Sequence, residues 1–200
     1  RQRGRRCVPR IGRWCMSRVS DLLDAYKAEL SLTWKDNVSG GERVWMLVYP
    51  PDLERSIRHA LPSFELATTQ ARRGWVVLDV TDDFGRWLSS HRHAEAFYEE
   101  PTDLTQSILD QFETALVARI REALDAAPAG AVVALVGIGS IFPFLRASSV
   151  IKSIDTAVTG RLLVLFPGLH DPETHSFRLL DARDGFNYRA RVIDPQKDLA

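Results

Sequence analysis

Residues 131–139 read AVVALVGIG, and this uninterrupted apolar run of strand length decides the fold. A strand without a polar face must be covered on both sides, as strands are in parallel sheets that lie between helices. Similar runs predict three further strands: VWMLVY at 44–49, GWVVLDV at 74–80 and RLLVLFPG at 161–168. We expect the 131–139 strand to lie at the centre of the sheet.

Helical patterns alternate with these strands, and the longest is predicted over 103–126, where apolar residues recur at every fourth position. The other predicted elements are helices at about 20–31, at 52–62, within 84–100 and from about 148, a loop at 31–43, and a terminal strand pair, FRLL and NYRARVI, with an Asp-Gly turn. The alternation predicts an α/β fold, a mostly parallel sheet with helices on both faces. We expect it to resemble a P-loop-like core that lacks the phosphate-binding loop.

Charge divides the chain into two parts. Residues 1–15 hold six arginines, both cysteines and no acid, whereas the rest carries 20 basic and 26 acidic side chains. We interpret 1–15 as a basic arm upstream of a true start at Met16, and 16–200 as a single α/β domain. A body with an excess of acids is poorly suited to wrapping nucleic acid. No apolar run reaches the ~20 residues that a membrane-spanning helix needs, so no membrane association is expected.

The carboxyl ends of the predicted strands are where a sheet of this kind binds ligands. The first turn, YPPDLER at 49–55, has no glycine and two prolines, so it cannot cradle a phosphate in the usual way. The turn at 137–140, Gly-Ile-Gly-Ser, lacks the third glycine of a dinucleotide fingerprint, and no aspartate for Mg²⁺ follows that strand. We therefore expect no nucleotide and no other cofactor.

Two groups of side chains have the composition of a metal site. The stretch GLHDPETH, with His170 and His175, holds four potential ligands in six residues, but a solvated turn explains it more simply. The second group is Asp79, Asp82 and Asp83, which could form a carboxylate site for a cation, but Asp83 before Phe84 is interpreted as a helix cap. We assign no metal ligand and no catalytic residue and expect no enzymatic activity. Two alternatives stay open: a metal-dependent nuclease or phosphodiesterase that uses Asp79, Asp83 and the 170–175 cluster, and a nucleic-acid-binding accessory protein.

The loop after the 131–139 strand carries more apolar side chains than a turn needs, and Pro143 restricts its shape. Such a loop can anchor a partner protein, and an arginine just beyond it can pair with a carboxylate of that partner. The simpler interpretation is that these side chains close the end of the core. The candidate partner-binding residues are Ile138, Ile141, Phe142, Phe144, Leu145, Arg146, Pro167 and His170.

Four stretches, VWMLVYPPDLE, VVALVGIGSIFPFLRASSVIKSID, LLVLFPG and FRLLDARDGFNYRARVI, together resemble the B-protein family of bacterial BREX phage-exclusion systems, over about 18–194. The resemblance implies a cytoplasmic component of an anti-phage operon that works beside a PglZ-type alkaline-phosphatase-like protein, a large ATPase and an adenine-specific DNA methyltransferase. It implies a non-catalytic assembly role, with the PglZ-type protein as partner and DNA contacted only indirectly. A homodimer is left open. The basic arm departs from the family, which favours a start at Met16.

Overall fold

A computed structural model describes residues 11–35, 38–180, 182 and 185–193, with the backbone alone for 11–17. Five parallel strands form a sheet in the order β2-β3-β4-β1-β7. They are β1 (Val44–Tyr49), β2 (Trp75–Asp79), β3 (Val132–Val136), β4 (Arg161–Asp171) and β7 (Arg191–Ile193). The end of β4 continues beyond them and pairs antiparallel with β5 (Ser176–Leu179), which pairs with β6 (Phe186–Asn187). The predicted α/β class is confirmed.

The four predicted buried or half-buried strands are present, but the central position belongs to β4. Val164 of β4 lies opposite Met46 of β1 on one side and Leu135 of β3 on the other. The 131–139 run is therefore an interior strand next to β2, and the expectation that it lies at the centre was wrong by one position. Both β3 and β4 have neighbours on both sides, so apolar content alone cannot rank them.

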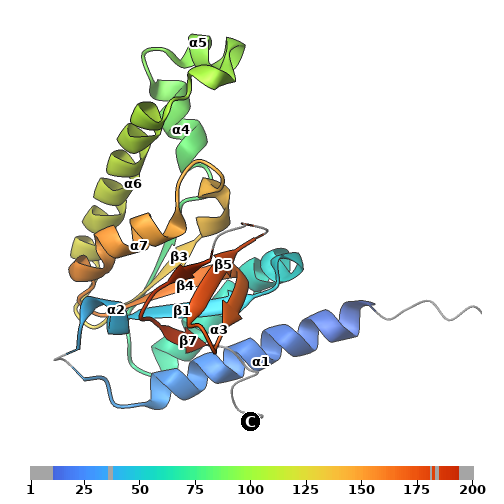
Figure 1. The fold of residues 1–200 in the computed structure, drawn as a ribbon. Coiled ribbons are helices and arrows are strands. Elements are labelled where there is room, and N and C mark those ends of the chain that lie inside the picture. The colour runs from blue at the N-terminus through green and yellow to red at the C-terminus, as the bar shows by residue number, and fades with distance from the viewer. Residues whose placement is uncertain (1–10, 36–37, 181, 183–184, 194–200) are drawn as a thin grey trace, which may run out of the picture.

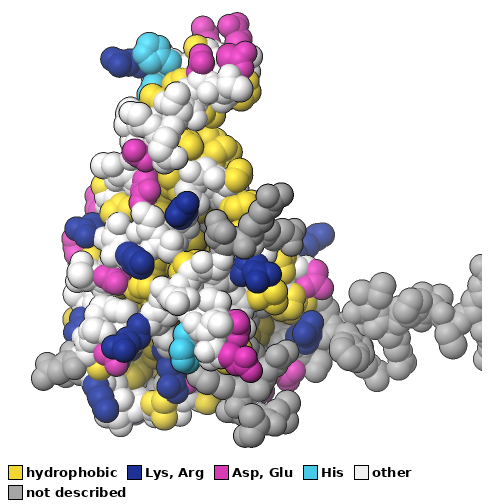
Figure 2. Space-filling view, in the orientation of Figure 1, with side chains coloured by type: hydrophobic (Ala, Val, Ile, Leu, Met, Phe, Trp, Pro, Cys, Tyr) yellow, Lys and Arg dark blue, Asp and Glu magenta, His cyan; other side chains and the backbone are white. Residues whose placement is uncertain are grey.

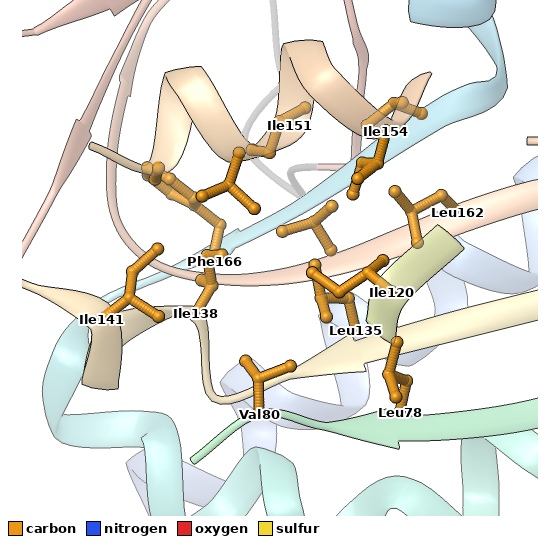
Figure 3. Packing of buried hydrophobic residues seen from close by; sticks show 14 of the residues in the cluster. Leu78, Val80, Ile120, Leu135, Ile138, Ile141, Ile151, Ile154, Leu162 and Phe166 are labelled. Atoms are coloured by element: carbon orange, nitrogen blue, oxygen red, sulfur yellow. The ribbon is translucent and has the colours of Figure 1, made fainter. Parts of the chain in front are cut away.

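Helices cover both faces of the sheet (Figure 1). On one face lie α1 (Ile11–Ser31) and α3 (Glu54–Gln70), and on the other α6 (Gln106–Ala126) and α7 (Ala147–Ile154). The side chains of each strand alternate between these two helical layers, because successive residues of a strand point to opposite faces of the sheet. In β1, Trp45 and Leu47 pack toward α1 and α3, and Met46 packs toward α6 and α7. Figure 3 shows this second core, in which Ile120, Leu135, Ile151 and Leu162 meet.

The helices differ from the sequence prediction in some of their bounds and in one added turn. The first helix begins at Ile11 and not near residue 20, so it starts inside the predicted arm. The predicted loop 31–43 contains a single helical turn, α2 (Gly40–Arg43), which Ser39 and Glu42 close with a capping box. The third helix runs through Pro62 to Gln70.

Pro62 does not end α3 because the buried stripe of the helix continues beyond it. A proline in a helix removes one backbone hydrogen bond. Phe64 and Thr68 are nonetheless buried, and the Thr68 hydroxyl is 2.6 Å from the Tyr26 hydroxyl of α1. Burial of a Phe side chain contributes about 1.5–3 kcal/mol, enough to offset much of the cost of one proline.

Residues 84–100 form two short helices, α4 (Asp83–Ser90) and α5 (Ala94–Glu99), as the sequence allowed. Together with the N-terminal half of α6 they project beyond the sheet (Figure 1). Aromatic rings line the inside of this projection: the Trp87 and Phe112 ring centres are 5.4 Å apart, and those of His91 and Phe97 are 5.1 Å apart. Acidic side chains gather at its tip (Figure 2). The remaining elements are 3₁₀ turns, η1 (Pro51–Leu53), η2 (Pro101–Asp103), η3 (Ile138–Ile141) and η4 (Asp155–Ala157).

Only the first part of the predicted terminal strand pair is present. β6 pairs with FRLL, but residues 191–193 leave the pair and lie parallel to β1 at the sheet edge. Ile193 is buried there, and Arg191 donates a 2.6 Å bond to Glu29 of α1. The predicted Asp-Gly turn lies partly outside the described residues. None of the described helices is long and apolar enough to span a membrane.

Deleting residues 1–15 is expected to leave the thermal midpoint unchanged, because the buried positions of α1, Leu22, Tyr26 and Leu30, all remain. Leu22→Ala in the full chain is the control and should cost about 2–5 kcal/mol. Calorimetric melts of the three proteins check this. A fall of about 2–4 °C on deletion, on the order of 1 kcal/mol, would mean that residues 1–15 pack against the domain.

Candidate functional site

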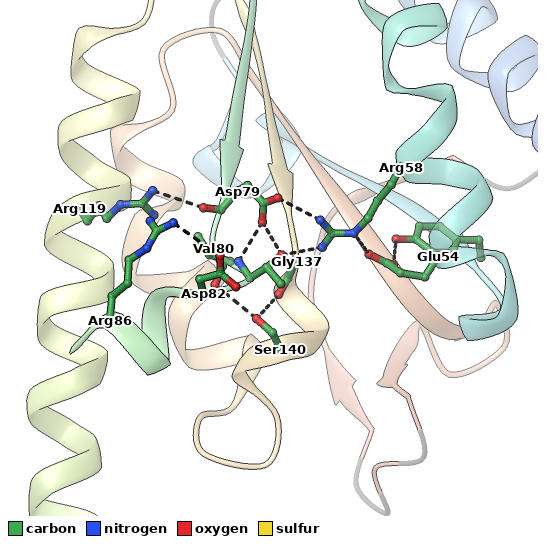
Figure 4. Close-up of polar contacts among 11 residues, drawn as sticks. Glu54, Arg58, Asp79, Val80, Asp82, Arg86, Arg119, Gly137 and Ser140 are labelled. Atoms are coloured by element: carbon green, nitrogen blue, oxygen red, sulfur yellow. Dashed lines mark hydrogen bonds and ion pairs between the residues drawn. The ribbon is translucent and has the colours of Figure 1, made fainter. Parts of the chain in front are cut away.

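A network of ion pairs occupies the carboxyl ends of β2 and β3 (Figure 4). Arg58 of α3 donates to Asp79 Oδ2 at 3.0 Å and to Thr81 Oγ1 at 2.7 Å. Its Nε also donates to Glu54 Oε1 at 2.7 Å, one helical turn earlier. A single guanidinium therefore connects the first turns of α3 with the end of β2.

A second arginine reaches the same strand end from the other face of the sheet. Arg119 of α6 donates to Asp83 Oδ2 at 2.5 Å and to the backbone oxygen of Asp79 at 3.3 Å. Asp83 was interpreted as a helix cap, but this buried side chain pairs with the partly exposed Arg119 instead, and the N-cap of α4 is Asp82, which makes no capping bond. The two arginines thus attach α3 and α6 to one point of the sheet.

The turn after β3 lies tightly against this network, and Gly137 is required there. Its φ of +86° lies in the left-handed region, and a Cβ at this position would lie 2.8 Å from the Thr81 backbone nitrogen. Ser140 donates to the Gly137 carbonyl at 2.8 Å and closes the turn. The Gly-x-Gly pattern therefore serves close packing of two strand ends.

The two aspartates of the network have opposite pKa shifts. Partial burial raises the pKa of Asp79, but hydrogen bonds from Thr81 and the charge of Arg58 outweigh it and hold this pKa below its usual value. Burial raises the pKa of Asp83 above its usual value even though Arg119 lies beside it. Ionised Asp79 is thus well stabilised, while ionised Asp83 depends on its one strong partner.

The residues of the open metal-site alternative are not brought together. Within the described part of the chain, no group of three His, Cys, Asp or Glu side chains is arranged to hold a metal ion. His170 packs on the ring of Phe177 at 4.7 Å. Asp171 caps its own turn, accepting from the Glu173 nitrogen at 2.9 Å and from the Thr174 hydroxyl at 2.8 Å. The simpler interpretation of GLHDPETH as a turn agrees with these contacts.

The turn after β1 presents an acid where a phosphate cradle would place backbone donors. The Tyr49 hydroxyl donates to Glu54 Oε2 at 2.5 Å, and Glu54 lies in the first turn of α3. Pro50 and Pro51 contribute no backbone N–H. This strand end therefore lacks the row of backbone donors that a phosphate cradle needs.

The candidate partner-binding residues differ in how far they are exposed. Ile138, Ile141, Leu145 and Pro167 are buried, so they close the end of the core. Phe144 is half-buried and stacks on Phe84 of α4, with ring centres 3.7 Å apart. Phe142 and Arg146 reach solvent, and Phe142 is 40% exposed. The peptide bond between Phe142 and Pro143 is cis. His170 is half-buried farther along β4.

Phe142 and Arg146 line a groove of about 250 Å³ between the start of α7 and the end of the β5–β6 pair. Its other lining residues are Pro143, Leu145, Ala147, Ser148, Leu179, Ala182, Gly185 and Phe186. The two walls are about 40 residues apart in the sequence. Of the predicted residues, Phe142, Leu145 and Arg146 line this groove, whereas His170 lines a separate hollow of about 490 Å³ beside the β5–β6 pair.

Sequence reasoning missed three contributors to this region: Arg58, Arg119 and the β5–β6 wall of the groove. The pair Glu54 and Arg58, four residues apart at the start of a helix, is a signal that could have shown the strand end to be occupied by charge. Arg119 and the wall residue Phe186 carry no such local signal, because both act across long sequence separations.

Comparison with known proteins gives one result. A family model described as BREX protein BrxB matches residues 77–193, which extend from β2 to β7 and include the groove. No curated protein matches the chain, and no solved structure matches it. The resemblance to a P-loop-like core therefore stays a prediction.

Asp79→Asn is expected to lower the free energy of unfolding at pH 7 by on the order of 1 kcal/mol, allowing for solvent screening at this 47%-exposed side chain. A carboxylate with a depressed pKa stabilises the fold above its unfolded pKa, and this contribution is lost as pH falls through the folded pKa. The difference from the wild type should therefore shrink below about pH 4.

Denaturant titrations from pH 7 to pH 2.5 measure this difference. Asp82→Asn is the matched control, because it removes the same charge from an exposed side chain whose ion pair with Arg86 spans 3.5 Å. Equal effects of the two substitutions, or a difference that does not depend on pH, would contradict the role assigned to Asp79.

ATP, GTP and their Mg²⁺ complexes are expected to give no binding heat, because Glu54 and two prolines occupy the strand end at which a phosphate would lie. Isothermal titration calorimetry checks this, with a known nucleotide-binding protein as positive control. Binding with a micromolar dissociation constant would overturn the prediction that the chain binds no nucleotide.

Proposed function

The chain belongs to the BREX protein BrxB family, and on that premise we propose that it is a non-catalytic assembly component that binds a PglZ-type phosphatase-like protein. Family membership implies a component of a BREX defence system and suggests other BREX components as partners. The proposal adds the direct partner and the absence of a catalytic role.

One observation carries the proposal: the groove beside the 137–148 loop exposes Phe142, Pro143 and Arg146, while the other residues of the loop are buried or half-buried. Protein interfaces concentrate their binding energy in a few aromatic and arginine side chains within well-packed pockets. Here both kinds of side chain line one hollow, and Phe144 secures the loop through its stacking on Phe84. The arrangement suits a preformed docking site.

The ion pairs at the strand ends support a structural role for the acidic residues there. Arg58 and Arg119 bind Asp79 and Asp83 on both faces of the sheet. Both carboxylates thus already have cationic partners, which connect α3 and α6 to the end of β2. This favours assembly over hydrolysis by a nuclease or phosphodiesterase.

Contact with DNA is proposed to be indirect. On the face that Figure 2 shows, Lys and Arg side chains are scattered among acidic and neutral ones. Binding to a phosphate backbone depends on clustered cations. The BREX ATPase and methyltransferase are further candidates for contact in the cytoplasm, and they would join through the PglZ-type protein.

Co-expression with the PglZ-type protein of the same operon should yield a complex that survives affinity purification and gel filtration. The chain alone should show no phosphodiesterase or nuclease turnover with Mg²⁺, Mn²⁺, Ca²⁺ or Zn²⁺. The complex is expected to weaken as the salt concentration rises, since the exposed Arg146 lines the groove beside its apolar side chains. Recovery of the two proteins in separate fractions would overturn the proposed partner. Turnover abolished by Asp79→Asn would overturn the non-catalytic role.

A further inference from the structure

The groove beside the 137–148 loop has a chemical character that limits what can fill it. Its floor is formed by buried side chains, Leu145, Ala147 and Leu179. Phe142 stands on one wall and Phe186 on the other. The Phe186 ring is supported by Phe166 and Phe177, with ring centres 6.1 Å and 5.8 Å away. Apolar side chains backed by the core thus form part of the hollow, and polar atoms form the rest.

The charge carried by the described lining residues of the groove is positive. Arg146 is the one charged side chain of the lining, and it makes no ion pair or hydrogen bond with any described residue. The first turn of α7, which opens beside it, contains no acidic side chain. An exposed guanidinium at the rim of an apolar hollow favours a carboxylate beside an apolar group.

The size of the groove argues against a cofactor. Sites for drug-sized ligands and cofactors typically enclose about 300–1,000 Å³. At about 250 Å³ this hollow lies below that range and suits one large side chain of a polypeptide. The surrounding rim can then contact the residues on either side of it.

We infer that the groove binds a short segment of the partner protein in which a large apolar side chain lies next to an Asp or Glu. The apolar side chain fills the hollow between Phe142 and Phe186, and the carboxylate pairs with Arg146. This inference rests on the proposed function, because it places the segment on the PglZ-type partner.

A second copy of this chain is the competing occupant. Tyr98 is 59% exposed at the tip of the projection, and Glu99 and Glu100 follow it directly. A contact between the tip of one copy and the groove of another joins two different surfaces, so it would extend into open chains of copies unless the geometry closes it. Binding of a segment from a different protein ends with one complex and needs no ring closure, which favours the partner protein over a second copy of this chain.

Photocrosslinking identifies the occupant directly. A benzophenone side chain in place of Phe142, in the full chain co-expressed with the PglZ-type partner, should crosslink to a partner peptide with a large apolar residue within about two positions of an Asp or Glu. Mass spectrometry of the digested adduct reads out that peptide. A crosslink to the Tyr98 peptide, or to a partner segment without an acid, would overturn the inference.

Affinity measurements test the two contacts separately. Arg146→Glu and Phe142→Ala should each weaken partner binding about tenfold or more, Arg146→Gln less, and Arg146→Lys least. Arg55→Glu is the matched control: it makes the same charge change at an exposed position of α3, on the opposite face of the sheet, and should leave binding unchanged. Thermal midpoints of all variants show whether a loss comes from unfolding, and Arg146→Gln remains informative if Arg146→Glu does not fold.

The outcomes separate the inference from the proposed function. If the wild-type chain captures no PglZ-type protein, the proposed function fails. If the wild type captures it and the folded Arg146 and Phe142 variants capture it equally well, the partner stands and the groove inference falls.

Discussion

Burial of three neighbouring strands on both faces is the constraint on which the rest of the structure depends. β1, β4 and β3 have no polar face, so each needs helices above and below and a hydrogen-bonding neighbour on each side. Parallel strands need crossover connections, and these supply α3, α6 and α7, whereas α1 precedes β1. Two edges remain, and β2 and the three-residue β7 close them. The carboxyl ends of all five strands consequently gather at one end of the molecule.

Much of this could be predicted because burial on both faces leaves a direct trace in the sequence. AVVALV at 131–136 can be little else than an interior strand, and the four-residue repeat of α6 predicts its buried residues from Phe112 to Ile120. The central place of β4 could not be predicted, since strand order is set by connections over long distances. Pro62 was taken as a helix end because its local cost is visible, whereas the compensating burial of Phe64 and Thr68 against α1 is not.

The residues of the candidate site likewise differ in whether a local sequence pattern could reveal their place. The spacing of Ile138, Ile141 and Leu145, three and four residues apart, marks one buried face of a turn, and it could have separated them from Phe142, which lies between. The β5–β6 wall has no such signal, because Phe186 meets the loop only after the chain has passed through β4. The ion pairs of Arg58 and Arg119 likewise join residues 21 to 36 positions apart. Local pattern predicts which side chains are apolar, and the fold alone determines which of them face solvent.

The stacking of Phe144 on Phe84 has a consequence for encounter kinetics. It anchors the middle of the 137–148 loop to α4, while Ile141 and Leu145 anchor it to the core on either side. A loop held at three points has little freedom to lose when another molecule arrives, so complex formation contains no ordering step on this side. Association would then proceed at the ordinary rate of rigid docking, about 10⁵–10⁷ M⁻¹s⁻¹. Differences in affinity between variants would come mainly from the dissociation rate.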